Sequence, residues 1–308
     1  MEPTMTVFQQ TFPLSREAAI PAVGFGTYLI SQEDAKEAVR SAILNGYRHI
    51  DTAEVYENEE SVGAGIRAGI AEAGLTREDI FVTTKLWQGH AAWGQKLKNE
   101  EETVAAFNGS LERLGLNYVD LYLIHAPHGG SERLNQWRGL LEIKRLGKAR
   151  SIGVSNYSEK HLEEIKAAGL PLPDANQIEL HPWSQKPELV AYMKENGIAP
   201  IAYSSLAPLS TWRAEPGQDS AKTEAMKISD GVLAAMAAKY GVTEAQLLLR
   251  WGVQNGYAVL PKSLNPERMR QNIDLGGFVI DAADLASMKA MDRGDGIAWS
   301  IGDPTHTD

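Results

Sequence analysis

The sequence predicts a (β/α)8 barrel of the TIM type, an α/β fold in which eight parallel strands alternate with helices. Three observations predict it. Short apolar segments alternate with amphipathic helical patterns over the whole chain, the length of 308 residues suits one such barrel, and no linker-like composition divides the chain. We therefore expect a single domain over residues 1–308.

Eight segments have the character of strands, and several are continuously apolar, as strands covered on both faces tend to be. They are residues 22–27, 47–51, 80–85, 119–125, 150–155, 176–180, 199–204 and 257–261. Helical periodicity fills the intervals between them and follows the last one. These helices are expected at residues 33–45, 59–73, 101–114, 132–146, 159–168, 186–196, 243–254 and 266–273. Two more helical patterns exceed the alternation, one after the seventh strand (228–240) and one near the C-terminus (281–291).

An open Rossmann sheet is the alternative α/β fold, and it needs a glycine-rich turn between its first strand and first helix. The only match to G-x-G-x-x-A consists of Gly63, Gly65 and Ala68. It lies inside a helical pattern, where glycines allow close packing of helices, and not at a strand-to-helix turn. The closed barrel is therefore favoured.

Composition excludes several classes of function. The formal net charge is -10 and no block of Lys or Arg occurs, so neither nucleic acid nor an anionic membrane is expected as a partner. The absence of cysteine excludes disulfides, thiolate metal sites and thiol nucleophiles. No signal-peptide pattern and no membrane-spanning apolar stretch occurs. We expect a cytoplasmic enzyme acting on a small molecule, as a monomer or a weak dimer.

Polar side chains stand at nearly every predicted strand end, the face of a barrel where active sites lie. They are Asp51, Lys85, His125, Ser155 with Asn156, Gln177, Tyr203 with Ser204, and Lys262. Singly they have ordinary explanations: an aspartate after a strand is more often a helix cap, a lysine lies in water, and a histidine packs in the core. Tyr56 alone would be a packing residue. An acid, a lysine and a histidine ending three consecutive strands favour a shared function.

Such a set suits proton transfer to a carbonyl oxygen. A tyrosine with a pKa of roughly 10 is a poor acid near neutrality, and an adjacent ammonium lowers that pKa. A buried lysine needs a carboxylate partner, and a neutral histidine can polarise a carbonyl. Side chains cannot supply hydride, so a nicotinamide or a flavin is required. A metal site is not expected, because His125 and His128 lack nearby carboxylates and no H-E-x-x-H motif occurs. No G-x-S-x-G motif occurs, so an esterase is not supported either.

Eight motifs, in matching order and spacing over nearly the whole chain, resemble those of the aldo-keto reductases. They are GFGTY, GYRHIDTAEVYENE, TTKLW, LYLIHAP, GVSNYS, NQIELHPW, AYSSLAP and LPKS. The resemblance implies a catalytic tetrad of Asp51, Tyr56, Lys85 and His125. Tyr56 would be the general acid for carbonyl reduction, Lys85 would lower its pKa, and Asp51 would hold Lys85.

The resemblance also implies NADPH as the cofactor. Ser155, Asn156 and Gln177 would hold the carboxamide, Tyr203 would stack on the nicotinamide, and Ser204, Ser205 and Leu206 would wrap the pyrophosphate. Lys262, Ser263 and Arg268 would hold the 2′-phosphate, Gln271 and Asn272 would lie near the adenine, and Gly26, Thr27 and Tyr28 would complete the site. The residues themselves agree, because PKSLNPERMRQN is locally basic and opens a helix after Asn265. A solvated helix start is the alternative.

The substrate pocket would comprise Tyr28, Trp87, His125, Ala126 and Trp299. Ala126 stands where the family usually has Trp, which should open one wall, and Gln271 stands where glutamate is usual. The loop after Trp87 looks long and brings His90 and Trp93 toward the rim, where they could anchor the loop or contact substrate. Trp212, in the segment 206–226, would close over the cofactor or the substrate.

The leading interpretation is an NADPH-dependent reductase of aldehydes and ketones with an apolar aromatic pocket. A nicotinamide-binding barrel that serves as a regulatory or binding subunit is the first alternative, which the intact tetrad disfavours. A barrel isomerase or lyase without nicotinamide is the second, disfavoured by Asn156, Gln177 and Tyr203. The sequence does not select one carbonyl substrate.

Overall fold

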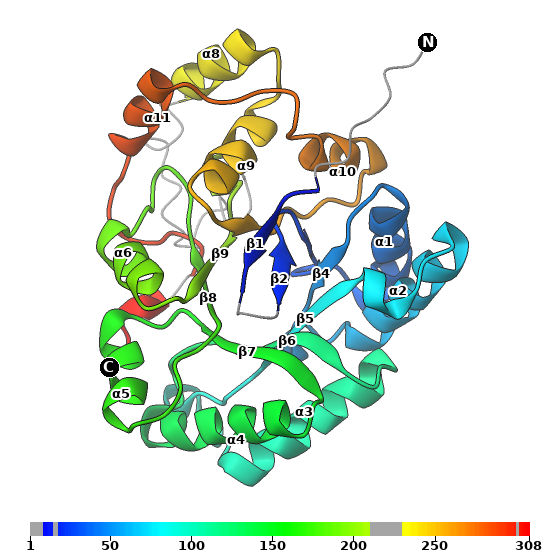
Figure 1. Cartoon of the computed structure of the whole chain (residues 1–308), viewed down its shortest axis with the longest axis vertical. Coiled ribbons are helices and arrows are strands. Elements are labelled where there is room, and N and C mark those ends of the chain that lie inside the picture. The colour runs from blue at the N-terminus through cyan, green and yellow to red at the C-terminus, as the bar shows by residue number, and fades with distance from the viewer. Residues whose placement is uncertain (1–8, 15–17, 210–229, 300–301) are drawn as a thin grey trace.

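The structure, a computed structural model, describes residues 9–14, 18–209, 230–299 and 302–308. Eight parallel strands follow one another around the barrel in the order of the chain (Figure 1). They are β3 (Phe25–Gly26), β4 (His49–Asp51), β5 (Phe81–Leu86), β6 (Val119–Ile124), β7 (Ala149–Ser155), β8 (Ala175–Glu179), β9 (Ala199–Tyr203) and β10 (Ala258–Val259). The predicted fold class is therefore confirmed.

The barrel closes between its first and last strands, which are both only two residues long. Val23 forms a parallel bridge with Val259, and the amide nitrogen of Gly26 donates to the carbonyl oxygen of Pro261 at 3.1 Å. A Cβ atom on Gly26 would lie 3.0 Å from the carbonyl oxygen of Leu260, so only glycine fits comfortably at this closure. The predicted strands 22–27 and 257–261 are thus too long.

Helices surround the barrel at the positions that the sequence predicts. They are α1 (Gln32–Leu44), α2 (Glu59–Ala73), α3 (Glu100–Leu114), α4 (Arg133–Arg145), α5 (Glu159–Ala167), α6 (Pro187–Glu195), α9 (Glu244–Gln254) and α10 (Pro266–Ile273). The two additional helices are α8 (Asp230–Tyr240) and α11 (Ala282–Lys289). Local signals set the boundaries: α3 begins at a capping box of Asn99 and Glu102 and ends at Gly115, which is left-handed (φ 62°). In the described part of the chain, no helix is long and apolar enough to cross a membrane.

An antiparallel hairpin near the N-terminus was not predicted from the sequence. Its strands are β1 (Thr11–Pro13) and β2 (Ala19–Pro21), which lie across the barrel opening in the foreground of Figure 1. Ile20 and Leu14 are buried and pack against interior side chains such as Leu121 and Ile201. The hairpin therefore covers the end of the barrel where the strands begin, opposite the strand ends that carry the predicted site.

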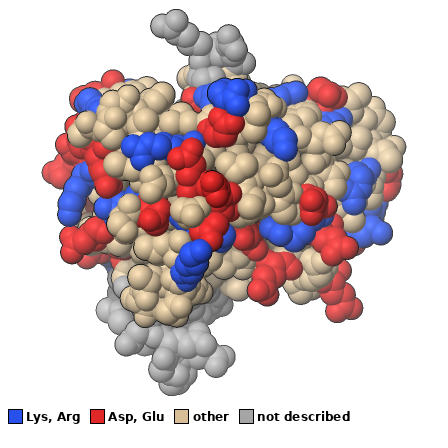
Figure 2. All heavy atoms as spheres, turned by 90° about the horizontal axis from the view of Figure 1, so that it is seen from below, with Lys and Arg blue, Asp and Glu red and all other residues tan. Residues whose placement is uncertain are grey.

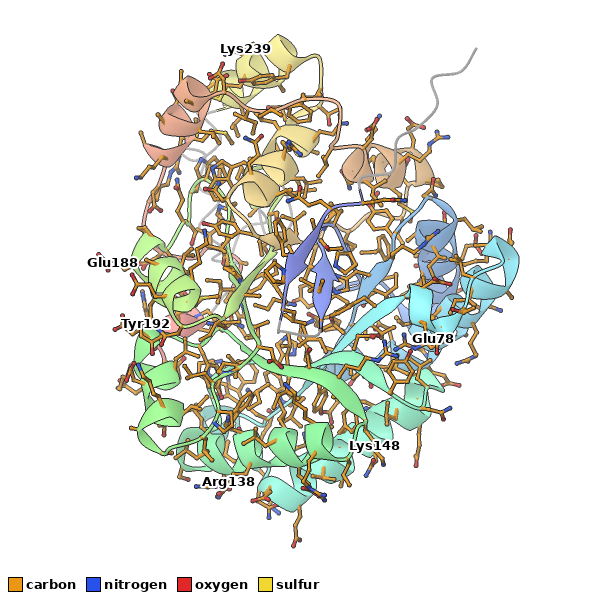
Figure 3. The ribbon with its side chains drawn as sticks, viewed as in Figure 1. Glu78, Arg138, Lys148, Glu188, Tyr192 and Lys239 are labelled. Atoms are coloured by element: carbon orange, nitrogen blue, oxygen red, sulfur yellow. The ribbon has the colours of Figure 1, made fainter. Side chains whose placement is uncertain are left out.

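Side chains alternate along each strand between the barrel interior and the helices. In β6, Leu121 and Leu123 belong to the interior cluster, whereas Tyr122 and Ile124 belong to the larger cluster under the helices. Figure 3 shows the interior filled with side chains, while labelled charged residues such as Glu188 and Lys239 lie at the periphery. On the face shown in Figure 2, acidic and basic residues are interspersed.

Candidate active site

The four predicted tetrad side chains meet at the carboxyl end of the barrel. Asp51 is the last residue of β4, Lys85 lies in β5, and His125 follows β6. The ammonium of Lys85 donates to Asp51 Oδ1 at 2.5 Å and to the hydroxyl oxygen of Tyr56 at 3.3 Å. Lys85 is only 1% exposed, so its charge is held by these neighbours and by the carbonyl oxygen of Thr52 at 2.9 Å.

Asp51 pairs with a lysine and does not cap a helix. The short 3-10 helix that follows, η1 (Glu54–Tyr56), begins after Ala53 and has no side-chain cap. The second carboxylate oxygen of Asp51 accepts a hydrogen bond from Gln177 Nε2 at 2.8 Å. A buried carboxylate needs such partners, and here one amide and one ammonium share it.

Tyr56 reaches the site because the turn that carries it is clamped. Asn58 donates to the carbonyl oxygens of Thr27 and Ile30 at 3.0 and 2.9 Å, and it accepts from Thr52 Oγ1 at 2.9 Å. Glu57 adopts a left-handed conformation (φ 55°) that ends η1. The ring of Tyr56 then lies edge-on to the ring of His125, with centroids 5.6 Å apart.

The protonation states follow from burial and from the ion pair. Burial raises the pKa of Tyr56 more than the Lys85 ammonium lowers it, so the net direction is upward. The expectation that Lys85 lowers the pKa of Tyr56 is thus confirmed for the effect of the lysine itself, and burial outweighs that effect. For Lys85, burial lowers the pKa, but Asp51 and Tyr56 outweigh it and the net pKa is raised. At neutral pH the lysine is charged and the phenol keeps its proton.

His125 is neutral. Burial lowers its pKa well below the usual value, and Lys85 and His128 lower it further. Its backbone amide donates to the carbonyl oxygen of Leu86 at 3.0 Å, which fixes the start of the loop after β6. Its Nδ1 is buried and has no hydrogen-bond partner within the described ranges. A neutral imidazole here can donate one hydrogen bond to a bound carbonyl oxygen.

The residues predicted to hold the nicotinamide lie together and bond to one another. Ser155 Oγ donates to the carbonyl oxygen of Gln177 at 2.7 Å, and Asn156 Nδ2 donates to that of His125 at 3.0 Å. The hydroxyl of Tyr203 donates to Asn156 Oδ1 at 2.7 Å. Asn156 is left-handed (φ 64°), and its Nδ2 also donates to Ser155 Oγ at 3.1 Å. Their contact with a carboxamide stays a prediction.

The other predicted cofactor residues occupy two regions of the rim. Thr27 follows the barrel closure at Gly26, and its hydroxyl donates to the carbonyl oxygen of Asp51 at 3.0 Å. Tyr28 is partly exposed, and its ring lies 5.1 Å from that of Tyr56. After β9, Ser204 is left-handed (φ 52°), Ser205 is buried and Leu206 is half-buried. These residues therefore lie at the rim of the barrel, and their contact with a cofactor stays a prediction.

The predicted phosphate region surrounds the start of α10. Asn265 caps this helix and accepts from the amide nitrogens of Glu267 and Arg268 at 2.9 and 3.1 Å. Lys262 and Arg268 are exposed, and neither forms an ion pair with a residue that the structure describes. Of the remaining predicted residues, Ser263 is half-buried, Gln271 donates to Glu267 at 3.3 Å, and Asn272 is buried. Two cations at a helix start, neither of them in an ion pair with a described residue, suit an anionic group.

Six aromatic side chains form a closed ring of pairwise contacts, here called the aromatic circuit. It runs through His125, Trp87, Trp93, His90, His128 and Trp299, and returns to His125. Exposure rises along it from the buried His125 to Trp93, which is 49% exposed. The circuit brings Trp87 and Trp299 beside the tetrad, as expected, and also His90 and Trp93. Ala126 is fully buried (0% exposed), so its place in a pocket wall stays a prediction, and Trp212 lies outside the described residues.

The segment that carries Trp299 is anchored by a carboxylate, Glu179, that was not among the predicted site residues. Glu179, the last residue of β8, accepts from the amide nitrogens of Ile297 and Ala298 at 2.7 and 2.9 Å. The indole nitrogen of Trp299 donates to the hydroxyl of Tyr203 at 2.9 Å. The signal was present, because Glu179 is a charged residue inside a predicted strand.

Comparisons with known proteins agree with this geometry. The model of the aldo/keto reductase family matches residues 22–293. The chain is 38% identical to morphine 6-dehydrogenase of Pseudomonas putida, over 91% of this chain and 90% of that protein. It is 36% identical to glyoxal reductase of Bacillus subtilis, over 94% and 95%. The crystal structure of a Bombyx mori aldo-keto reductase in complex with NADP superposes with a TM-score of 0.83, at 34% identity over 96% of each chain.

A match over most of the chain, together with relatives above 30% identity at nearly full length, decides the kinship. The chain belongs to the aldo/keto reductase family.

Proposed function

We propose that this protein reduces aldehydes or ketones to alcohols with NADPH, and that Tyr56 is the general acid. One observation carries the proposal: the buried Lys85 ammonium lies 3.3 Å from the Tyr56 hydroxyl and 2.5 Å from the Asp51 carboxylate. A cation fixed beside a phenol stabilises the phenolate that remains after the proton is given away. The neutral His125 beside Tyr56 adds a hydrogen-bond donor for the same carbonyl oxygen.

The proton path follows from these contacts. A carbonyl oxygen placed between Tyr56 and His125 accepts hydrogen bonds from both side chains. As negative charge develops on that oxygen, Tyr56 transfers its proton, and the Lys85 ammonium stabilises the phenolate. Asp51 holds the ammonium in place, and Gln177 holds Asp51. Because the raised pKa keeps Tyr56 protonated, the acid is in the correct state near neutrality.

The residues present fit a nicotinamide cofactor. Lys262 and Arg268 offer two exposed cations at the start of α10 in an acidic protein, which suits a 2′-phosphate. Asn156, Gln177 and Tyr203 stand beside the tetrad, where a nicotinamide would need to lie. When bound, the nicotinamide supplies the hydride. The Bombyx mori relative, solved in complex with NADP, supports this assignment.

Kinship supports the reaction class and does not select a substrate. Two relatives are named for morphine and for glyoxal, compounds of very different size. We expect a carbonyl compound that fits beside Tyr28, Trp87 and Trp299, and we expect the protein to act in the cytoplasm as a monomer or a weak dimer.

The test is NADPH consumption with a panel of carbonyl compounds: an aliphatic aldehyde, an aromatic aldehyde, a dicarbonyl and a bulky ketone. At least one should be converted to its alcohol. Tyr56→Phe keeps the ring and removes the hydroxyl, so kcat should fall by about 10²–10⁴-fold while NADPH still binds. If Tyr56→Phe kept most of its turnover with several substrates, the assignment of the general acid would be wrong.

A further inference from the structure

A glutamate and a lysine outside the tetrad hold the backbone of Trp87. This residue directly follows β5, so its peptide groups lie beyond the ladder of strand hydrogen bonds and need other partners. Its amide nitrogen donates to Glu54 Oε2 at 2.8 Å, and its carbonyl oxygen accepts from the ammonium of Lys98. Glu54 Oε1 lies 3.4 Å from the same ammonium. The two side chains therefore form one unit, here called the Trp87 clamp.

The two residues of the Trp87 clamp come from different parts of the chain. Glu54 begins η1, the short helix that also carries Tyr56. Lys98 lies at the end of the loop after β5, where its amide nitrogen donates to the carbonyl oxygen of Gln88 at 3.1 Å. The side chains of Glu54 and Lys98 are each 24% exposed. Because an ion pair this open contributes little stability by itself, the importance of the clamp lies in the peptide groups that it binds.

The indole of Trp87 is held by the loop and faces the tetrad. Its Nε1 donates to Gln95 Oε1 at 2.8 Å, and its ring stacks on Trp93 with centroids 5.9 Å apart. The indole also lies edge-on to His125, with centroids 5.7 Å apart and an angle of 83° between the planes. Because the clamp ties the backbone of Trp87 to the helix that carries Tyr56, it fixes this ring relative to both proton donors.

We propose that Glu54 and Lys98 are positioning residues for the substrate pocket. They fix the backbone of Trp87, and the fixed indole then contacts those carbonyl substrates that are large enough to reach it. This inference rests on the proposed reductase function. Within the described ranges, neither clamp side chain is hydrogen-bonded to a tetrad side chain. Loss of the clamp should therefore weaken the binding of large substrates and leave proton transfer intact.

The test compares benzaldehyde, whose ring can contact the indole, with the smaller propanal. Glu54→Ala removes a charge-assisted hydrogen bond and so lowers the fraction of molecules whose indole is in place, which should raise KM for benzaldehyde about tenfold. KM for propanal should change far less. For both aldehydes kcat should stay as in the wild type, and so should the dissociation constant of NADPH. Glu54→Gln keeps an oxygen acceptor for the amide nitrogen of Trp87 and should recover part of the affinity.

Variants of the lysine test the other half of the clamp. Lys98→Met removes the donor to the carbonyl oxygen of Trp87 and should act in the same direction as Glu54→Ala. Lys98→Arg restores a donor and should recover part of the affinity for benzaldehyde. Lys96→Met is the matched control, because Lys96 lies in the same loop, pairs with Glu102 and has a side chain that is 78% exposed. It should leave both KM values as in the wild type.

A double-variant cycle separates positioning of the indole from a general structural effect. Trp87→Ala removes the indole and keeps the peptide groups that the clamp binds. In this background, Glu54→Ala should no longer change the ratio of the two KM values, because the ring that Glu54 positions is gone. A ratio that changed there by the same factor as in the wild-type background would overturn the proposal, since Glu54 would then act elsewhere.

The remaining outcomes distinguish this inference from the proposed function. If the wild type reduces both aldehydes and every clamp variant keeps the wild-type KM values, the positioning role is wrong and the reductase proposal stands. Equal falls in kcat for both aldehydes would also overturn the positioning role, because Glu54 and Lys98 would then support the tetrad. If the wild type reduces no carbonyl compound of the panel with NADPH, both proposals are wrong.

Discussion

Lys85 is the side chain on which the site depends most, because one buried cation serves both a carboxylate and a phenol. We predict that Lys85→Met lowers kcat about as far as Tyr56→Phe does, by about 10²–10⁴-fold, since the phenolate loses its counter-charge. Among the residues that the structure describes, the same change leaves the buried Asp51 carboxylate only Gln177 as a side-chain partner, so the free energy of unfolding should fall by about 3–5 kcal/mol. Steady-state kinetics and urea unfolding measure the two effects.

Two double variants separate catalysis from stability. Asp51→Asn combined with Lys85→Met removes the uncompensated charge, so it should be more stable than Lys85→Met alone and equally inactive. Tyr56→Phe combined with Lys85→Met should be scarcely slower than either single variant, because the two residues act as one unit. If the fold losses in kcat of the two single variants multiplied in the Tyr56→Phe, Lys85→Met double variant, Lys85 would act independently of Tyr56.

At the residue scale, the positions of the site side chains were easier to predict from the sequence than their protonation states. Asp51, Lys85 and His125 were predictable because each stands at a strand end, and barrel strand ends converge. The net pKa direction of Tyr56 was not predictable, because it depends on how deeply the tertiary structure buries the phenol. The bond from Gln177 to Asp51 joins residues 126 positions apart, and no local pattern reveals it.

The start of α10 carries the prediction that belongs to the element scale. Replacing Lys262 and Arg268 by alanine should remove most of the preference for NADPH over NADH, because charge-assisted contacts contribute about 1.5–3 kcal/mol each. Dissociation constants for both cofactors, measured by fluorescence titration, give the preference directly.

Arg270→Ala is the control on the same helix, since Arg270 pairs with Glu267 and is not expected to meet the cofactor. It should leave the preference unchanged. A double alanine variant that discriminates as the wild type does would place the phosphate site elsewhere.

Helices and inner strands were predictable as elements because their periodicity is strong and their ends carry caps. The β1–β2 hairpin was not, because its three-residue strands are partly exposed and give no periodic signal. The strands β3 and β10 are shorter than their apolar segments because closure of the barrel passes through Val23 and Pro261, outside the regular ladder.

For the whole molecule, four buried histidines with lowered pKa values predict sensitivity to acid. Burial lowers the pKa of His49 to about 3, those of His128 and His161 to about 4, and that of His125 well below its usual value. The unfolded chain therefore takes up these protons first as the pH falls below about 6.5, and the folded state loses stability between there and pH 3–4. Above pH 6.5 these groups contribute nothing to the pH dependence.

Each such histidine should cost about 2 kcal/mol at pH 5 relative to pH 7.5. Urea unfolding at the two pH values measures the total. His49→Gln can still bond to Thr83, which lies 3.0 Å from the imidazole, and should reduce the loss by about one histidine's share. An unaltered pH dependence in that variant would mean that His49 is protonated equally in both states.

The hydrogen bond from Trp299 to Tyr203 has a consequence for the order and strength of binding. Trp299 belongs to the aromatic circuit, where substrate is expected, while Tyr203 stands where the nicotinamide is expected. A ligand that immobilises Trp299 or Tyr203 also restricts the other ring through this hydrogen bond. Substrate and cofactor should therefore each increase the affinity of the protein for the other. Linkage is reciprocal, so an unreactive carbonyl analogue should tighten NADP⁺ by the same factor by which NADP⁺ tightens the analogue. In Trp299→Phe, which cannot donate to Tyr203, calorimetry should find the two affinities independent, and the pair of rings would then be the thermodynamic contact between cofactor and substrate.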